Sequence, residues 1–268
     1  MRITHPQAAY RGIAPENMFF VYSDTQIQLG SGHLISFMQP ELSPARPHHI
    51  YMQIDAQPSA YGLLLGALLA RAEVLSAQNP GLPARLYTQL SPDDRQLLPF
   101  LHSCGMANDD AEDLVAFSTA QGAFARPPMG VQYASVPLDS QARSDGFAAR
   151  LNAMRISPIQ PDQLTLWREQ PHFLALGFYK NNRPVSELLI CGTGKSATLV
   201  SAYTLRDFRR QGMARNLILL ACGILHDQQG VETLYANVFR KNEPQAALMK
   251  SLGSHFVKTV SLLPGMDL

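Results

Sequence analysis

The sequence contains few cysteines and almost no excess charge, and both shortages exclude classes of protein. The three cysteines among 268 residues, Cys104, Cys191 and Cys222, are far apart and odd in number, which argues against a disulfide framework and a cysteine zinc site. The formal net charge is +1, so there is no broad basic surface of the kind that nucleic-acid binding needs. We expect a protein of the reducing cytoplasm, without a metal site, in which any anion-binding site is local.

Long apolar segments are also missing. The first 17 residues, MRITHPQAAYRGIAPEN, contain no apolar signal-peptide core. The most apolar run, residues 61–75 (YGLLLGALLARAEVL), is too short and too interrupted to span a bilayer, so we expect a buried helix and no membrane partner. With 46% hydrophobic and 16% charged residues, the chain can build a substantial core in one large domain or two ordinary ones.

A proline-rich stretch, AFARPPMG at 123–130, divides the chain into nearly equal parts that resemble each other. Its consecutive prolines exclude a helix or a central strand. When Tyr235 is placed over Tyr87, a shift of 148 residues, LYANVFRKNEPQAALMKSLG aligns with LYTQLSPDDRQLLPFLHSCG without a gap. Identities are few, and the alternative is chance similarity, because this order of elements is common in mixed folds. We predict two domains, 1–126 and 130–268.

The second half predicts a mixed α+β domain. The expected order is a strand, two helices, three strands, a long helix, a strand, a helix and a last strand, at 131–138, 140–155, 162–169, 173–182, 184–191, 197–204, 209–226, 232–239, 242–252 and 254–263. Turns are expected at Asn181–Asn182 and at GTGK (192–195), with Asn242 as an N-cap and Gly253 as a stop for the last helix. The first strands of the first half have no helical pair before them.

Residues 204–217, TLRDFRRQGMARNL, place adjacent arginines just before an apolar helix pattern. A helix N-terminus already carries partial positive charge and unsatisfied N–H groups. Two more cations there are favourable only beside an anion, and a phosphate group is the obvious candidate. Alternatively, Arg209 and Arg210 are solvated surface residues and Gly212 is an ordinary turn glycine, and the motif alone does not separate these hypotheses.

The loop and the elements after it resemble the core of the GNAT superfamily of acyl-CoA-dependent N-acyltransferases. The family loop reads Gln/Arg-x-x-Gly-x-Gly/Ala, and this sequence has RRQGMA at 209–214. A long helix, a strand, an Asn before a second helix and a Gly-Phe pair complete the pattern, here with Asn242, Gly253 and, after two extra residues, Phe256. The likeness covers about 198–256 and implies two tandem GNAT-like domains, each a mixed, mostly antiparallel sheet flanked by helices.

This resemblance implies a site for acetyl-CoA (coenzyme A) in the second half. The loop amides would bind the pyrophosphate, the two arginines would add charge-assisted bonds, and Gly212 would allow close approach. The preceding strand would pair with the pantetheine arm, and the amide of Thr204 would face the thioester oxygen. The expected cofactor-binding residues are Ala202, Thr204, Arg209, Arg210, Gln211, Gly212, Met213, Ala214 and Asn242.

Direct acyl transfer also needs a base for the amine and a proton for the departing thiolate. Glu187 interrupts the apolar strand VSELLI and is the candidate base, and the alternative is an edge-strand carboxylate that faces solvent. Tyr203 and Trp167 would line the acceptor site, or else pack in the core. Many family members have a tyrosine acid where this sequence has Met249, which cannot donate a proton. Glu187, Tyr203 and the Thr204 amide form the expected catalytic set.

The first half lacks these features. Its positions equivalent to the loop, 61–66, read YGLLLG, with Leu64 in place of the first glycine and no arginine, so we expect a degenerate repeat without cofactor. GTGKS at 192–196 lacks the glycine that a nucleotide-triphosphate loop requires at position 189. His48 and His49, at the start of a strand, should point to opposite faces, and the acidic run at 109–114 predicts a solvated face.

Together these features predict a cytoplasmic N-acyltransferase that moves an acetyl or short acyl group from acyl-CoA to a small-molecule or peptide amine. A non-catalytic acyl-CoA-binding or regulatory module is the alternative, which Met249 supports. A scaffold without any ligand would require the loop match to be accidental.

Overall fold

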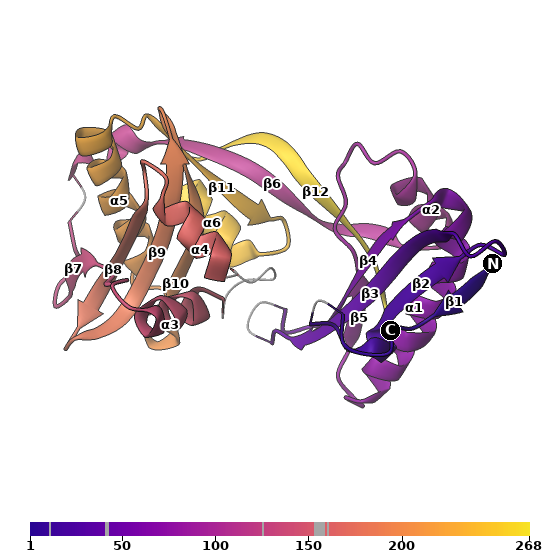
Figure 1. Cartoon of the computed structure of the whole chain (residues 1–268). Helices are drawn as coiled ribbons and strands as arrows, with labels where there is room; N and C mark the ends of the chain where they lie inside the picture. The colour runs from indigo at the N-terminus through magenta and orange to yellow at the C-terminus, as the bar shows by residue number, and fades with distance from the viewer. Residues whose placement is uncertain (11, 41–42, 125, 153–158, 160) are drawn as a thin grey trace. The chain divides into compact units, whose positions relative to one another are not determined.

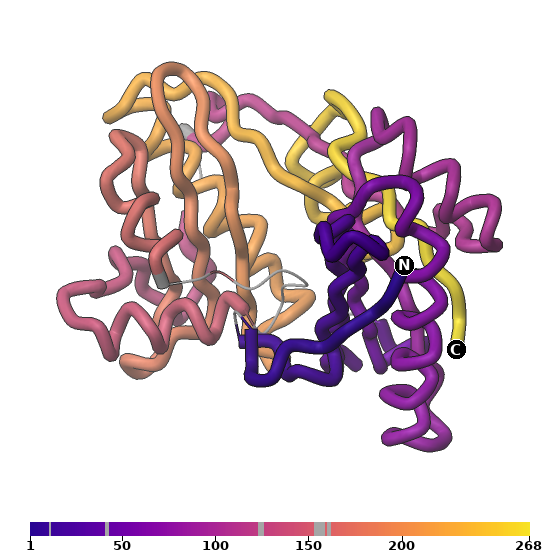
Figure 2. Tube along the Cα trace, turned by 45° about the vertical axis from the view of Figure 1, so that its right-hand side comes forward, coloured from indigo at the N-terminus to yellow at the C-terminus, as the bar shows by residue number. Residues whose placement is uncertain are grey.

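The computed structural model describes every residue except 11, 41–42, 125, 153–158 and 160 (Figure 1). Its strands and helices confirm the expected α+β class. The chain divides into two compact units: unit 1 comprises Met1–Glu112 with Thr259–Leu268, and unit 2 comprises Asp113–Lys258. Both chain ends therefore lie in unit 1 (Figure 2).

Two strands contribute residues to both units. Strand β6 (Ala107–Ser118) passes from unit 1 to unit 2, and β12 (His255–Asp267) passes from unit 2 to unit 1. The end of β12 pairs antiparallel with β5 (Ala84–Tyr87) and so completes the sheet of unit 1. The divisions between the compact units thus fall outside the proline-rich stretch, and the domain bounds 1–126 and 130–268 stay a prediction.

Unit 1 is built on a mixed sheet. Its first four strands are antiparallel neighbours in chain order, and β5 runs parallel to the fourth; they are β1 (Arg2–Thr4), β2 (Met18–Tyr22), β3 (Gln28–Met38) and β4 (His48–Ala56). Helix α1 (Tyr61–Ala77) follows β4, and α2 (Leu97–Ser103) follows β5. As predicted, no α-helix precedes β2, β3 or β4 in the part of unit 1 that the structure describes.

Helix α1 packs one side against this sheet. Its buried residues are Tyr61, Leu64, Leu65, Leu68, Ala72 and Leu75, and they form a core with Val21, Ile50 and other strand residues. The helical run Pro58–Ala77 has 20 residues and is long and apolar enough to cross a membrane, so the expectation that it is too short is wrong. By itself such a helix is weak evidence for a membrane span, because core helices meet the same criteria.

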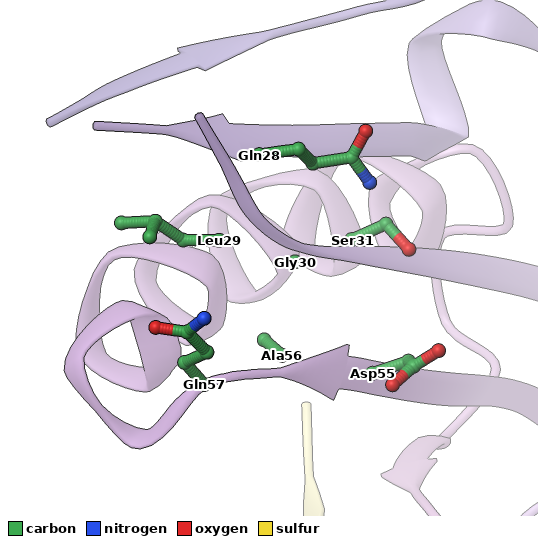
Figure 3. A pocket seen from close by; sticks show the side chains of 7 residues that line it. All are labelled: Gln28, Leu29, Gly30, Ser31, Asp55, Ala56 and Gln57. Carbon is green, nitrogen blue, oxygen red and sulfur yellow. The ribbon is translucent and has the colours of Figure 1, made fainter. Parts of the chain in front are cut away.

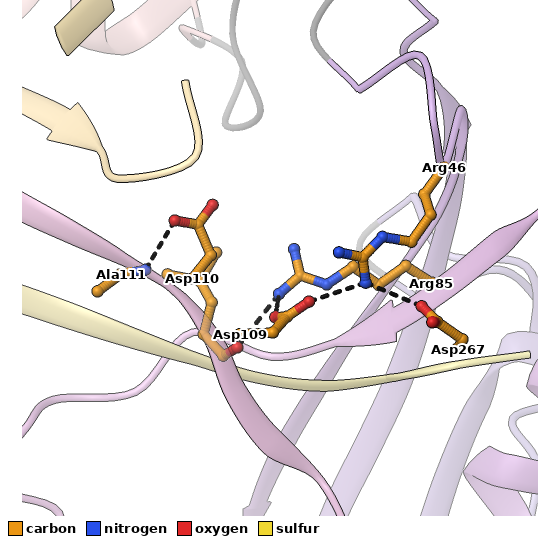
Figure 4. A network of polar contacts seen from close by, with 7 residues as sticks. Arg46, Arg85, Asp109, Asp110, Ala111 and Asp267 are labelled. Atoms are coloured by element: carbon orange, nitrogen blue, oxygen red, sulfur yellow. Dashed lines mark hydrogen bonds and ion pairs between the residues drawn. The ribbon is translucent and has the colours of Figure 1, made fainter. Parts of the chain in front are cut away.

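The acidic run at 109–114 is not the solvated face that its composition suggested. Within unit 1, Asp109 accepts hydrogen bonds from Arg46, at 2.8 Å, and from Arg85 (Figure 4). Arg46 also contacts Asp267 of β12 at 2.8 Å. Arg85 lies on β5 and Arg46 lies just before β4, so Asp109 pairs with cations from two other segments and an ion-paired network results.

Unit 2 has the strand order β6–β11–β10–β9–β8–β7. Strands β7 to β10 are antiparallel neighbours and β11 runs parallel to β10; their bounds are β7 (Gln132–Ser135), β8 (Leu174–Lys180), β9 (Arg183–Thr193), β10 (Ser196–Thr204) and β11 (Thr233–Phe239). Both predicted turns are confirmed. Asn181 and Asn182 have φ of 51° and 61° between β8 and β9, and Gly194 has φ of 63° between β9 and β10.

Helices cover both faces of this sheet (Figure 1). One core includes Leu188 and side chains of α5 (Met213–Gln229) and α6 (Glu243–Ser251). The other includes Leu189 and side chains of α3 (Gln141–Asn152) and α4 (Pro161–Arg168). Leu188 and Leu189 lie in different cores because successive strand side chains point to opposite faces.

The predicted repeat is visible in the bounds of the elements. A shift of 148 residues places β4 on β10 residue for residue, and the short helix η2 (Pro58–Ala60) on η4 (Arg206–Phe208). The same shift superposes the ends of α2 and α6 and the starts of β6 and β12. The long helices differ: α1 begins at Tyr61, the equivalent of Arg209, whereas α5 begins only at Met213.

Candidate functional site

The site lies where β10 and β11 separate in unit 2. Their parallel pairing joins Ser196–Leu199 to Thr233–Ala236, and both strands continue beyond it. The register between β10 and β9 shifts between Leu199 and Ser201, which marks a bulge. Because a bulge bends a strand and increases its local twist, it helps the end of β10 to diverge from β11.

The divergence leaves backbone groups of β10 directed at the gap. The amide of Leu205 donates to the carbonyl oxygen of Val185 on β9 at 2.9 Å. Successive amides of an extended chain point to opposite edges, so the amide of Thr204 points to the β11 side. The Thr204 hydroxyl lies 2.9 Å from that of Ser186. The orientation of this amide fits its expected role as a hydrogen-bond donor to a ligand oxygen.

The loop between β10 and α5 has an unusual backbone path. Arg210 has φ of 64° and Gly212 has φ of 75°, so two residues of this short loop adopt the left-handed conformation. The loop is braced by its own side chains: Arg209 Nε donates to the carbonyl oxygen of Thr204 at 3.1 Å, and Gln211 Nε2 donates to that of Asp207 at 2.9 Å. Alternating backbone conformations of this kind turn amides into an anion-binding concavity.

Helix α5 begins with amides that the helix itself does not satisfy. The first intrahelical bond runs from Asn216 N to Gly212 O at 2.9 Å, which leaves the amides of Met213, Ala214 and Arg215 without an intrahelical acceptor. In the described chain no side chain caps this end, since its N-cap is Gly212. Together with the helix dipole, these amides form a site suited to an oxygen anion.

Glycine is required at the centre of this loop. A Cβ atom on Gly212 would lie 3.2 Å from Asn216 Nδ2, and the φ of 75° is one that other residues rarely adopt. Arg209 is half-buried and Arg210 is exposed, so their guanidinium groups can add positive charge next to the amides. The geometry therefore fits the diphosphate of the expected cofactor.

The remaining four expected cofactor residues also have defined places in the structure. The side-chain oxygen of Asn242 accepts from Gln245 N at 3.1 Å and caps α6, as predicted for an N-cap. Met213 is buried in the core, so it can offer only its amide. Ala202 packs against the same core, and Ala214 is half-buried in the first turn of α5. Direct cofactor contacts of these residues stay a prediction.

Glu187 lies in the interior of unit 2, between β8 and β10, so the alternative of an edge-strand carboxylate facing solvent is wrong. Its side chain has 0% exposure. Arg150 of α3 donates from Nε to Oε2 at 2.5 Å and from Nη2 to Oε1 at 2.8 Å. This two-point ion pair explains how a carboxylate is kept inside the sheet, because a lone buried charge would be very unfavourable.

Tyrosines surround this ion pair. Tyr203 lies opposite Glu187 on β10, and Gly177 lies opposite it on β8. The ring of Tyr179 packs over Gly177, within 3.0 Å of the position a Cβ would take. Burial and the nearby Glu187 raise the pKa of Tyr179, and Arg150 lowers it. Trp167 of α4 packs on the same side, against the core that Tyr203 also contacts.

Met249 points away from this cluster. It is 3% exposed and belongs to the core beneath α5 and α6. Among the described residues of that core none is a tyrosine, so no phenol replaces the family acid from this side.

Unit 1 has an open pocket beside the paired ends of β3 and β4, the strands equivalent to β9 and β10. Its volume is about 410 Å³, and its lining is Gln28, Leu29, Gly30, Ser31, Asp55, Ala56 and Gln57 (Figure 3). Gly30 pairs with Ala56 as Ser186 pairs with Thr204, and the β4–β5 pairing also ends after four residues. The lining contains one carboxylate and no cation. Unit 1 thus keeps the equivalent pairing of β3 with β4, but its β5 ends where the pairing with β4 ends and it lacks the arginine loop.

Sequence reasoning missed Arg150 and Tyr179. Arg150 precedes its partner by 37 residues and lies on a different element. The only available signal was an isolated carboxylate in an apolar strand, which requires a cation from elsewhere in the fold. Within the described ranges, no group of three His, Cys, Asp or Glu side chains is placed to hold a metal ion.

Residues 144–253 match the model of the acetyltransferase (GNAT) family. No curated protein sequence matches the chain significantly. Solved structures that resemble it include a GCN5-related N-acetyltransferase from Anabaena variabilis, with 12% identity, coverage of 98% of this chain and 72% of the other, and a TM-score of 0.62. Another, from Sphaerobacter thermophilus, has 14% identity, coverage of 96% and 82%, and a TM-score of 0.52.

A third structure is a probable N-acyltransferase from Enterococcus faecalis, with 11% identity, coverage of 92% of this chain and 61% of the other, and a TM-score of 0.58. At these identities the likeness concerns the fold. The predicted resemblance and the predicted fold of two GNAT-like domains are confirmed.

Proposed function

We propose that this chain, whose residues 144–253 match the model of the acetyltransferase (GNAT) family, transfers an acetyl or short acyl group from acyl-CoA to an amine. The family supports acyl transfer in general, and the choice of acyl group and acceptor is our proposal. The observation that carries it is the arginine-flanked start of α5 beside the separated strands β10 and β11. We assign this activity to the domain at 130–268 and expect the domain at 1–126 to lack it.

The residues of the site fit coenzyme A. The amides of residues 210–214 and the guanidinium groups of Arg209 and Arg210 would hold the diphosphate. The free edge of β10 near Ala202 would pair with the pantetheine amides, in the way a strand adds to a sheet edge. When bound, acetyl-CoA supplies an activated thioester, and the Thr204 amide would stabilise negative charge on its oxygen.

Glu187 would accept the proton of the attacking amine. Both of its oxygens are bonded to Arg150, but each carboxylate oxygen has a further lone pair. Because the side chain is fully buried, we expect the proton to pass through the Tyr203 hydroxyl or a water molecule. The nitrogen–carbon bond forms as the carbon–sulfur bond breaks, and the thiolate takes its proton from water or Tyr203. A thiolate is a fair leaving group near neutral pH, since thiols have a pKa of about 8.5.

A non-catalytic acyl-CoA-binding or regulatory module is the second candidate. The buried Met249 and the ion pair that occupies Glu187 both favour it. The test combines calorimetry with coenzyme A and measurement of thiol release from acetyl-CoA with a panel of small-molecule and peptide amines. Amine-dependent thiol release supports the enzyme, and tight binding without any acylation supports the module. Absence of coenzyme A binding by the folded protein would overturn both. The proposed compartment is the cytoplasm, on the cysteine pattern alone.

A further inference from the structure

The ion pair of Arg150 and Glu187 presents its positive partner to the outside. The Glu187 side chain has 0% exposure, whereas that of Arg150 has 35%. The carboxylate lies behind the guanidinium, so a molecule that approaches the face of the sheet under α3 and α4 meets the arginine first.

Arg150 has unused hydrogen-bonding capacity in this position. A guanidinium has five N–H donors, and the bonds to Glu187 use Nε and Nη2. No partner of Nη1 is found within the described residues. Burying such donors against an apolar ligand would cost about 1–3 kcal/mol for each unsatisfied group. A ligand that fits this surface must therefore offer acceptors.

Two phenols add to the same surface. Tyr179 and Tyr203 lie close enough to Arg150 to interact with its charge, and each is half-buried. Neither hydroxyl has a hydrogen-bond partner elsewhere in the described chain. The cluster thus combines a guanidinium edge with two hydroxyl donors. Glu187 cancels the charge of Arg150, so one planar monoanion fits better than a doubly charged phosphate.

We propose that Arg150 binds a carboxylate of the acceptor, with Glu187 as the residue that positions it, so that the acceptor is an amine that also carries a carboxylate. This inference rests on the proposed acyl transfer. Tyr203, opposite Glu187, immediately precedes Thr204, and one strand residue spans about 3.3 Å. The carboxylate and the acylated nitrogen must therefore be close together, as in an amino acid.

The fluorescence of the single tryptophan offers a direct measure of binding. The chain has one tryptophan, and Trp167 packs beside Tyr203 on this face. We would titrate the full chain, loaded with coenzyme A, with N-acetylglycine and N-acetyl-L-leucine and with the amide of each, and follow tryptophan fluorescence. We expect saturable binding of the acids and at least tenfold weaker binding of the amides.

Variants separate this inference from a purely structural ion pair. Arg150→Met alone would leave a buried charge unpaired, so the double variant Arg150→Met/Glu187→Gln is the one to use. We expect it to lose the preference for acids, whereas Glu187→Gln alone should tighten binding of the acids because a competing carboxylate is removed. Arg143→Met, on the exposed side of α3 with its ion pair to Asp139, is the matched control and should change nothing.

Equal binding of acids and amides, no binding of either by the folded protein, or a retained acid preference in the double variant would each overturn the inference. Kinetics keep it distinct from the proposed function. Acylation confined to amines without a carboxylate would refute the carboxylate site while the transferase stands. Carboxylate binding without acylation of any amine would refute the transferase and leave the carboxylate site standing.

Discussion

The two units differ most where a strand leads into a long helix. In unit 1, η2 runs directly into α1 at Tyr61, whereas in unit 2 residues 209–212 form a loop between η4 and α5. Strand β10 bulges and β4 keeps one register along β3. In both units four residues of the two parallel strands are paired, but only in unit 2 do both strands continue beyond the pairing. Residues 209–212 therefore distinguish the proposed anion site of unit 2 from the ordinary start of α1 in unit 1.

The charges near the starts of α1 and α5 also differ between the two units. Burial, followed by the carboxylates of Asp94 and Asp55, raises the pKa of Tyr61, the first residue of α1. The start of α1 thus lies near two negative charges, whereas the start of α5 follows Arg206, Arg209 and Arg210. A helix dipole alone does not bind phosphate when carboxylates surround it, because each would repel the anion.

The largest expected difference between the units is in coenzyme A binding, which we expect in unit 2 and not in unit 1. The full chain should bind one coenzyme A, in unit 2, because unit 1 lacks the loop and its arginines. Isothermal titration gives the stoichiometry, and amide chemical shifts near Gly62 and Gly212 give the location. Two sites per chain, or shifts confined to the neighbourhood of Gly62, would reverse the assignment.

Gly212→Val should make unit 2 resemble unit 1. Valine is strained at a φ of 75° and would move the amides that face the diphosphate. The double change of Arg209 and Arg210 to Ala removes the cations instead, each charge-assisted bond being worth about 1.5–3 kcal/mol. We expect affinity for coenzyme A to fall by about 10²-fold or more in either variant.

The control for the glycine change is Gly194→Val. Gly194 has a φ of 63° in the β9–β10 turn, and among the described residues none except its chain neighbours lies within 4 Å of the position that a Cβ would take. This variant therefore tests backbone strain away from the site. Calorimetry that finds unchanged affinity in both loop variants, with the fold intact by circular dichroism, would remove the loop from cofactor binding.

The two units also differ at Glu187, which pairs with Tyr203 in unit 2. The equivalent residue of unit 1 is Ser31, which pairs with Asp55. Glu187→Gln should slow acylation by about 10²-fold, the usual scale for a general base, whereas Glu232→Gln, an exposed carboxylate paired with Lys195, should not. Rates against pH would be measured for both variants with the best amine of the panel. Full activity in Glu187→Gln would exclude it from the mechanism.

Tyr203→Phe tests whether Tyr203 or water supplies the proton to the thiolate, and Met249→Ala is expected to act through packing alone. A loss confined to the chemical step in Tyr203→Phe would make Tyr203 the acid. Met249 is 3% exposed, so its truncation should cost about 2–5 kcal/mol of stability through a cavity and leave the chemical step intact. Denaturant unfolding and single-turnover kinetics measure the two effects separately.

The smallest expected effect concerns unit 1. Burial, with the neighbouring charges of Arg85, Arg46 and His48, lowers the pKa of His49 to about 4. The unfolded chain, with a histidine pKa of about 6.5, therefore takes up the proton first. Stability should be complete above pH 6.5 and fall by about 2–3 kcal/mol as the pH drops toward 4. Denaturant unfolding of His49→Phe should lack this part of the acid sensitivity; the same decline in both proteins would refute it.

Some features followed from the sequence because neighbours in the chain decide them. The Asn242 cap, the turns at Asn181 and Gly194, and the glycine at 212 depend on local backbone angles and on contacts within a few residues. The repeat was also readable, because its period leaves the same order of elements in both halves. The loop motif, the expected fold and the family resemblance belong to this group.

Only the tertiary structure decided what brings distant segments together. It paired Glu187 with Arg150, paired Asp109 of the acidic run with Arg46 and Arg85, and placed the last ten residues in unit 1. Buried charges need partners, but a sequence does not say which cation the fold will deliver. Strand pairing likewise has no local signature, because any strand edge offers the same backbone groups to every other.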